Sequence, residues 1–96
     1  MQIEFDAEVR RWDARADSWY FAVVPEELSA DIRELPAPPR GFGALRVRVR
    51  VGATRWATSI FFSRGTYSLP LKRAVREAER IEDGDVIRIE LEVVDL

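Results

Sequence analysis

The sequence predicts a mainly β fold, a small β-barrel with two short capping helices, formed by a single domain over residues 1–96. Most of the apolar segments alternate apolar and polar positions, as half-buried strands do. Two other segments have helical spacing, and each begins at a proline. Short strands leave exposed edges in an open sheet, so we expect the barrel to be closed or nearly closed.

The first part of the chain predicts a hairpin. Residues 2–12 alternate and predict a half-buried strand. Residues 13–17 (DARAD) are polar and predict the connection. Residues 18–24 (SWYFAVV) are apolar on both faces, so we expect a strand that is covered on both sides. Three aromatic residues of this strand are expected to contribute most to the core: Trp19, Tyr20 and Phe21.

A helix is expected to follow from Pro25, because proline suits the first helical position, where its missing N–H is not needed. Leu28, Ile32 and Leu35 give this helix a narrow apolar stripe. It should end before residues 36–41 (PAPPRG), which we expect to form a stiff loop because proline disfavours helical backbone on both of its sides.

The middle of the chain predicts two strands joined by a glycine turn. Residues 45–51 alternate without exception, with Arg46, Arg48 and Arg50 on the outer face. Residues 54–62 predict the next strand, with two different faces. Trp56, Thr58, Ile60 and Phe62 lie on one face, and Ala57, Ser59 and Phe61 lie on the other.

The last part repeats the order strand, proline, helix, glycine turn and strand. A turn with Gly65 leads to a short strand over residues 66–69, and Pro70 is expected to open the second helix. The core-facing positions of this helix should be Leu71, Ala74, Val75 and Ala78. Residues 86–94 predict the final strand. The same order in residues 18–51 and 66–94 indicates a repeat of architecture.

Composition excludes several kinds of chemistry. The chain has no cysteine and no histidine, so disulfides, zinc–thiolate sites and Ser-His-Asp or Cys-His catalysis are absent. We expect no cofactor and no metal; four aspartates (Asp13, Asp17, Asp83 and Asp85) lack the spacing of an EF-hand. Apolar runs are too short to span a bilayer, and no secretory signal is recognisable. We therefore expect a cytoplasmic protein that does not bind membranes.

The net charge of −2 is unevenly distributed. Residues 41–80 carry +7, whereas residues 1–40 carry −4 and residues 81–96 carry −5. Pairing of basic with acidic strands explains this most simply, and a basic surface for an anionic partner is the alternative. The pairing interpretation predicts that the three outer arginines of residues 45–51 are partly matched by carboxylates of a neighbouring strand. Those carboxylates are either Glu4, Asp6 and Glu8 or Glu90 and Glu92.

The segment over residues 55–80 carries the candidate anion-binding or ligand-binding site: Ser59, Tyr67, Lys72 and Arg76. Lys72 is the only lysine beside fourteen arginines, which suggests a need for a compact ammonium group. In a helix opened by Pro70, Lys72 would lie in the first turn, where free amides favour an anion, and Arg76 one turn further on. Tyr67 is expected at the rim with its hydroxyl free. Solvated surface charges, or pairing of Arg76 with Glu79 or Glu82, are the alternative.

Part of the chain resembles the half-barrel of the AbrB and MazE type. In that family a strand ends in a proline and leads into a short helix with an arginine, a Gly-Asp turn and an alternating strand. The matching residues are Leu69-Pro70, Arg76, Gly84-Asp85 and residues 87–93.

A second resemblance covers the whole chain. Its motifs are F-x-A-x-V from Phe5, W-x-F-x-x-V-P from Trp19, Gly41 and Gly43 before an alternating strand, W-x-T-S-I-F from Trp56, and Y-x-L-P-x-K-x-x-V-R from Tyr67. These resemble domain-of-unknown-function family nineteen hundred and five of bacteria. The resemblance implies a double-split β-barrel capped at both ends by helices, like an AbrB-type dimer fused into one chain. It implies no activity.

Together these observations predict a non-enzymatic module that binds a small anionic ligand or a protein partner, as a monomer or weak homodimer. An AbrB-like DNA-binding module is the alternative. The overall acidity and the acidic first helix make nucleic acid an unfavourable partner. A weak hydrolase with Ser59 as nucleophile and Lys72 as base is a third interpretation, although no oxyanion-hole pattern accompanies the pair.

Overall fold

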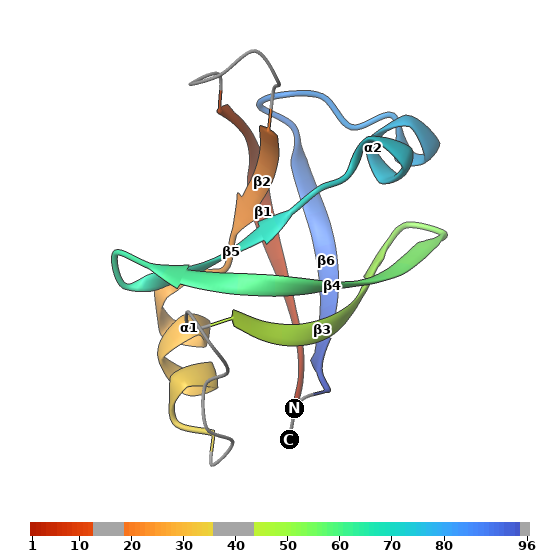
Figure 1. Ribbon diagram of the computed structural model, residues 1–96. Coiled ribbons are helices and arrows are strands. Elements are labelled where there is room, and N and C mark those ends of the chain that lie inside the picture. Colours follow the sequence, from red (N-terminus) through yellow and green to blue (C-terminus); the bar gives the residue numbers. More distant parts are fainter. Residues whose placement is uncertain (13–18, 36–43, 95–96) are drawn as a thin grey trace.

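Antiparallel strands close into a barrel in the order β1-β2-β5-β4-β3-β6, and β6 pairs again with β1 (Figure 1). This computed structural model describes residues 1–12, 19–35 and 44–94. The strands are β1 (Gln2–Trp12), β2 (Trp19–Val23), β3 (Ala44–Val51), β4 (Thr54–Ser63), β5 (Thr66–Pro70) and β6 (Val86–Val93), and the helices are α1 (Glu26–Arg33) and α2 (Arg73–Glu79). The expected turn over residues 13–17 and loop over residues 36–41 lie outside the described residues.

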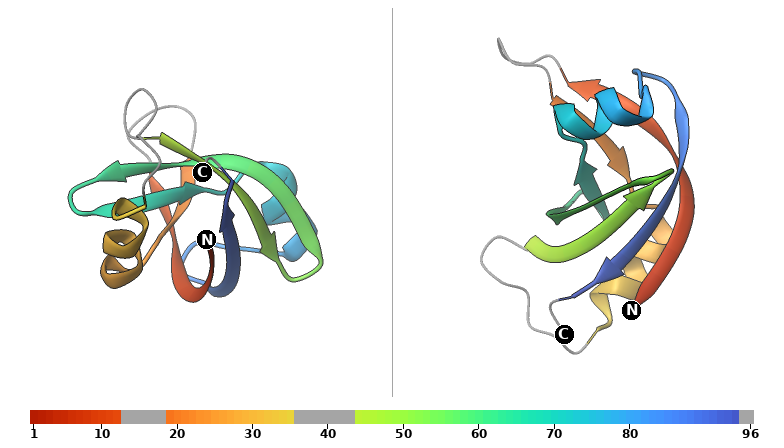
Figure 2. Two further views of the ribbon diagram at one scale, coloured as in Figure 1. Left: turned by 90° about the horizontal axis from the view of Figure 1, so that it is seen from below. Right: turned by 90° about the vertical axis from the view of Figure 1, so that its right-hand side faces the viewer.

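The strand order has an internal two-fold repeat. Exchanging β1 with β4, β2 with β5 and β3 with β6 returns the same set of strand neighbours. The two helices lie at opposite ends of the barrel (Figures 1 and 2). The expected repeat of architecture is therefore confirmed, and one chain closes the double-split barrel without a second copy.

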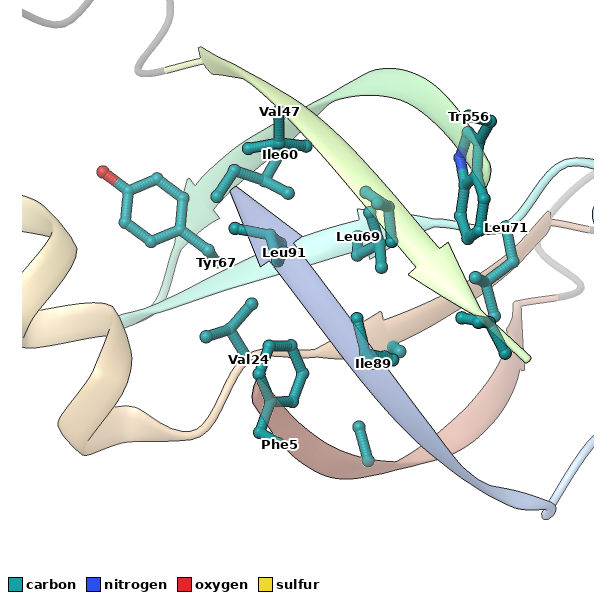
Figure 3. Packing of buried hydrophobic residues seen from close by; sticks show 14 of the residues in the cluster. Phe5, Val24, Val47, Trp56, Ile60, Tyr67, Leu69, Leu71, Ile89 and Leu91 are labelled. Atoms are coloured by element: carbon teal, nitrogen blue, oxygen red, sulfur yellow. The ribbon is translucent and has the colours of Figure 1, made fainter. Parts of the chain in front are cut away.

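Alternation in the sequence explains the core. The inward residues of β3 are buried from Leu45 to Val51, and Arg46, Arg48 and Arg50 are exposed between them, as predicted. Inward residues of β1 and β6 complete the same cluster, which Figure 3 shows at close range. The outer faces of β1, β6 and β3 are charged, so this part of the barrel wall is hydrophobic inside and ionic outside.

The prediction for β2 was wrong in one respect. Its outer face is only partly covered, and Trp19 is 56% exposed. Tyr20 and Phe21 are only half-buried, whereas the smaller Ala22 and Val24 are fully buried. The interior of a small barrel is narrow, so small side chains fill it at this position and the large aromatic residues remain at its margin.

The prediction for α1 is confirmed apart from its two ends, because the helix stops at Arg33 and Leu35 of the predicted stripe lies beyond it. Pro25 is the N-cap and the helix begins at Glu26. The apolar stripe packs on the core through Ile32, which is buried. Ser29 is a buried polar residue that the pattern did not predict. Its Oγ donates a hydrogen bond to the carbonyl oxygen of Val24 (3.1 Å) and accepts one from the amide of Tyr67 (3.0 Å).

The prediction that Pro70 opens the second helix was wrong. Pro70 is the last residue of β5, opposite Phe21 of β2. The amide of Leu71 donates to the carbonyl oxygen of Tyr20 (2.8 Å), so strand pairing continues past the proline and delays the helix to Arg73. The residues of α2 and its flanks that face the core therefore differ from those predicted. Leu71, Val75 and Ile81 are buried, and Ala74 and Ala78, predicted to face the core, are exposed.

Candidate functional site

Helix α2 is attached to the β3–β4 turn at its C-terminal end. The hydroxyl of Thr54 donates a hydrogen bond to Oε2 of Glu79 (2.6 Å). Gly52, in the same turn, has φ +59°, and a Cβ built there would lie 1.9 Å from Oε1 of Glu79. This close approach requires a residue without a side chain. The Thr54–Glu79 contact therefore fixes the position of α2 over one end of the barrel.

Arg76 of α2 is oriented by two contacts. Its Nε donates a hydrogen bond to the carbonyl oxygen of Leu71 (3.1 Å). Its guanidinium carbon lies 3.8 Å from the centre of the Tyr20 ring, a distance at which a cation is attracted to the face of the ring. The predicted alternative, pairing of Arg76 with Glu79 or Glu82, is not what the structure contains. The remaining guanidinium N–H groups are held in a defined direction and can bind an acceptor.

A pocket of about 230 Å³ lies beside this arginine, between β4, the end of β5 and α2. Its lining residues are Trp19, Tyr20, Trp56, Thr58, Pro70, Leu71, Lys72, Arg73 and Arg76. The structure therefore brings two of the four predicted site residues together, Lys72 and Arg76. Lys72 is the N-cap of α2 in extended conformation and not a residue of the first helical turn, so the predicted contribution of free helix amides does not apply to it.

The charge of this pocket is positive. Arg73 is paired with Glu77, with Nε and Oε1 2.7 Å apart. Within the described part of the chain, no carboxylate lies within ion-pair distance of Lys72 or Arg76. Two cations in one pocket repel each other unless an anion lies between them. The pocket therefore favours an anionic occupant.

Trp56 also lines this pocket. Its side chain is 8% exposed, and its indole Nε1–H is buried with no acceptor among the described residues. Buried donors are rarely left unpaired, because the loss of hydration costs about 1–3 kcal/mol. The sequence predicted Trp56 as a core residue, which it is, and no sequence signal indicated the unpaired donor. The described residues supply no oxygen acceptor for this N–H.

Ser59 and Tyr67 do not line this pocket. Ser59 lies on β4 opposite Arg46 of β3, on the face of the strand that points away from the core. Tyr67 is not a rim residue, because its side chain is only 5% exposed. Figure 3 shows it at the opposite end of the core from Trp56. Burial raises the pKa of the Tyr67 hydroxyl, and nearby Arg33 opposes this weakly.

A larger hollow of about 580 Å³ lies on the charged outer wall of β3, β4 and β6. Two of its three arginines have carboxylate partners, and Arg55 has no ion pair among the described residues. Arg50 is paired with Glu90 and Arg48 with Glu92, the second pair at 3.7 Å. The hydrogen bond from Arg50 lowers the pKa of the Glu90 carboxyl. The prediction that the outer arginines are partly matched by carboxylates of a neighbouring strand is therefore confirmed for Arg48 and Arg50, whereas Arg46 has no ion pair among the described residues.

The carboxylates of β1, predicted as the alternative partners of the β3 arginines, contact an arginine of β6 instead. Arg88 of β6 is hydrogen-bonded to Glu4 (2.8 Å) and lies 3.3 Å from Asp6, both on β1. The middle strand β6 thus pairs with both neighbours, through Arg88 with the acidic side chains of β1 and through its glutamates with the arginines of β3. This supports strand pairing as the reason for the uneven charge along the sequence.

Two further observations limit the kinds of site. No three acidic residues among those described are grouped so that they could hold a metal ion. No described helix is long and apolar enough to cross a membrane. In the pocket beside α2, Lys72 and Arg76 have no carboxylate partner among the described residues, and the same pocket is lined by Trp56, whose indole N–H is buried and unpaired.

The fold and the pocket define a class, the single-chain double-split β-barrels with a helix at each end. Comparison with family models identifies the chain more closely. Residues 5–91 match the model described as Domain of unknown function (DUF1905), so the protein belongs to this family. The match confirms the resemblance found in the sequence and assigns no activity. Comparison with curated proteins finds no match.

Proposed function

We propose that the protein is a non-enzymatic binding module that holds a small oxyanion, a phosphate, sulfate or carboxylate group, in the pocket beside α2. One observation carries the proposal. Lys72 and Arg76, both without a carboxylate partner in the described structure, line the same pocket as Trp56, whose buried indole N–H has no acceptor among the described residues. Charge-assisted hydrogen bonds to an oxyanion would use all three groups at once. The setting expected for this module is the cytoplasm.

Thermal unfolding with added phosphate tests this proposal. A ligand that binds only the folded state at ten times its Kd adds about 1.4 kcal/mol to stability. In a domain of this size that raises the Tm by about 5–10 °C. We expect this rise for the wild type and its loss in Lys72→Ala, with ionic strength kept constant by sodium chloride.

The matched control is Arg46→Ala. Arg46 is exposed on β3 and does not line the pocket, so this variant loses the same charge at another place. It should keep the full rise in Tm. Equal rises in the wild type, Lys72→Ala and Arg46→Ala would indicate exclusion of phosphate from the whole surface and would overturn the proposal.

A protein partner is the second candidate. It is favoured by Phe61, whose side chain is 48% exposed on the outer face of β4, together with the exposed tryptophans of the β1–β2 hairpin. Aromatic side chains supply much of the binding energy in protein interfaces. The chain closes its barrel alone, so a partner is not needed to complete the fold, and a monomer or weak homodimer remains the expected state.

An AbrB-like DNA-binding module has less support. Two of the three arginines of β3 are paired with Glu90 and Glu92, and α1 carries Glu26 and Glu27 in its first turn. Affinity for duplex DNA should fall steeply with salt if it exists at all. The hydrolase interpretation has less support still, because Ser59 lies outside the pocket that Lys72 lines.

A further inference from the structure

Two exposed tryptophans lie next to the pocket. Trp12 of β1 and Trp19 of β2 are directly opposite each other in the strand register. Their side chains are 53% and 56% exposed. Trp19 also lines the pocket beside α2. A single exposed aromatic residue needs no explanation, but here a cross-strand pair of indoles adjoins a cationic pocket.

The strand register places Trp19 beside Lys72. Phe21 of β2 faces Pro70 of β5, and continuing this register by two residues puts Trp19 opposite Lys72. The pairing does continue past Pro70, because the next residue, Leu71, donates its amide to β2. A flat apolar surface and an ammonium group without a carboxylate partner therefore lie side by side at the mouth of the pocket.

We propose that the ligand is an anion carried on a planar aromatic ring, a single-ring aromatic phosphate or carboxylate. This inference rests on the proposed oxyanion site. The acid group binds Lys72 and Arg76, and the ring stacks on the indole of Trp19. Aromatic rings gain from stacking on each other beyond the area that they bury, and an indole accepts any flat ring without requiring a particular pattern of hydrogen bonds.

The volume of the pocket limits the size of the ring system. At about 230 Å³ it is below the range of roughly 300–1,000 Å³ typical of pockets that enclose drug-sized ligands. One ring with its acid group therefore suits the pocket better than a fused ring system with a sugar.

Isothermal titration calorimetry with two phosphate monoesters tests the inference. Phenyl phosphate and methyl phosphate carry the same charged group and differ in the ring. We expect the wild type to bind phenyl phosphate about three- to tenfold more tightly, the range that one aromatic pair supplies. Trp19→Ala should abolish this preference and leave the Kd of methyl phosphate unchanged, and Trp19→Phe should restore most of the preference.

Phe61→Ala is the matched control, because Phe61 is similarly exposed, at 48%, and does not line the pocket. It should keep the full preference for phenyl phosphate. Equal affinities of the wild type for the two esters, or a preference that survives in Trp19→Ala, would overturn the inference and leave the oxyanion site standing. Failure of both esters to bind, or equal binding by Lys72→Ala, would overturn the proposed function itself.

Discussion

Replacing Gly52 by alanine tests how α2 is held over the barrel. The backbone at Gly52 has φ +59°, and a left-handed conformation costs an L-residue about 1–2 kcal/mol. The new Cβ would also lie 1.9 Å from Oε1 of Glu79. That carboxylate is the end of a flexible side chain and can move, but moving it breaks the hydrogen bond with Thr54, worth about 1 kcal/mol at this partly buried position.

The expected total is a loss of about 2–3 kcal/mol in the free energy of unfolding, or about 10–20 °C in Tm. Urea denaturation followed by circular dichroism measures the first quantity. Gly65→Ala is the matched control, since Gly65 also has positive φ (+87°) but an added Cβ would meet nothing within 4 Å. This variant should lose only the free energy that the left-handed backbone conformation costs an alanine, about 1–2 kcal/mol.

A double-mutant cycle isolates the contribution of the carboxylate. In a Glu79→Ala background the added Cβ meets no oxygen, so Gly52→Ala should then cost no more than Gly65→Ala. An equal cost of Gly52→Ala with and without Glu79 would show that the Thr54–Glu79 contact does not hold α2, and the reasoning would be wrong.

Three further predictions follow from single contacts. Ser29→Ala removes a buried hydroxyl that bonds two backbone groups, so it should cost about 1–3 kcal/mol in urea denaturation; a cost below 0.5 kcal/mol, the usual size of a neutral surface change, would contradict it. Because burial raises the pKa of Tyr67, the unfolded state loses this proton first, and stability should fall as the pH rises above about 10; Tyr67→Phe should flatten this part of the pH profile. The Arg50–Glu90 pair lies on the surface, so Glu90→Gln should lower stability only slightly in urea denaturation, and the loss should shrink in high salt; a large salt-independent loss would be inconsistent with a surface pair.

Most of the fold could be predicted from the sequence because a two-residue period determines which side chains face inward. This period placed β3 and β6 correctly and assigned the arginines of β3 to the outer face. It failed for β2, where hydrophobicity does not distinguish a covered face from an exposed one. It also failed at Pro70, because whether a proline ends a strand or opens a helix depends on whether a neighbouring strand continues to pair.

The candidate site was predicted only in part. Lys72 and Arg76 were found from composition and spacing, and the structure brings them together at one pocket. Tyr67 was misplaced, because its position beside a glycine turn gave no indication that α1 would bury it through Ser29. The unpaired N–H of Trp56 depends on long-range packing that a sequence pattern does not contain.

The central claim, an oxyanion site beside α2, is tested most directly by NMR during a phosphate titration at constant ionic strength. The chain has three tryptophans, and Trp12→Phe and Trp19→Phe, both at exposed positions, assign their two indole signals and leave the third to Trp56. We predict that the Trp56 indole N–H and the backbone amide of Lys72 shift along one saturating curve, and that Lys72→Ala abolishes it. Chemical-shift changes that do not saturate, or that are largest at the amides of the β3 arginines, would contradict an oxyanion site beside α2.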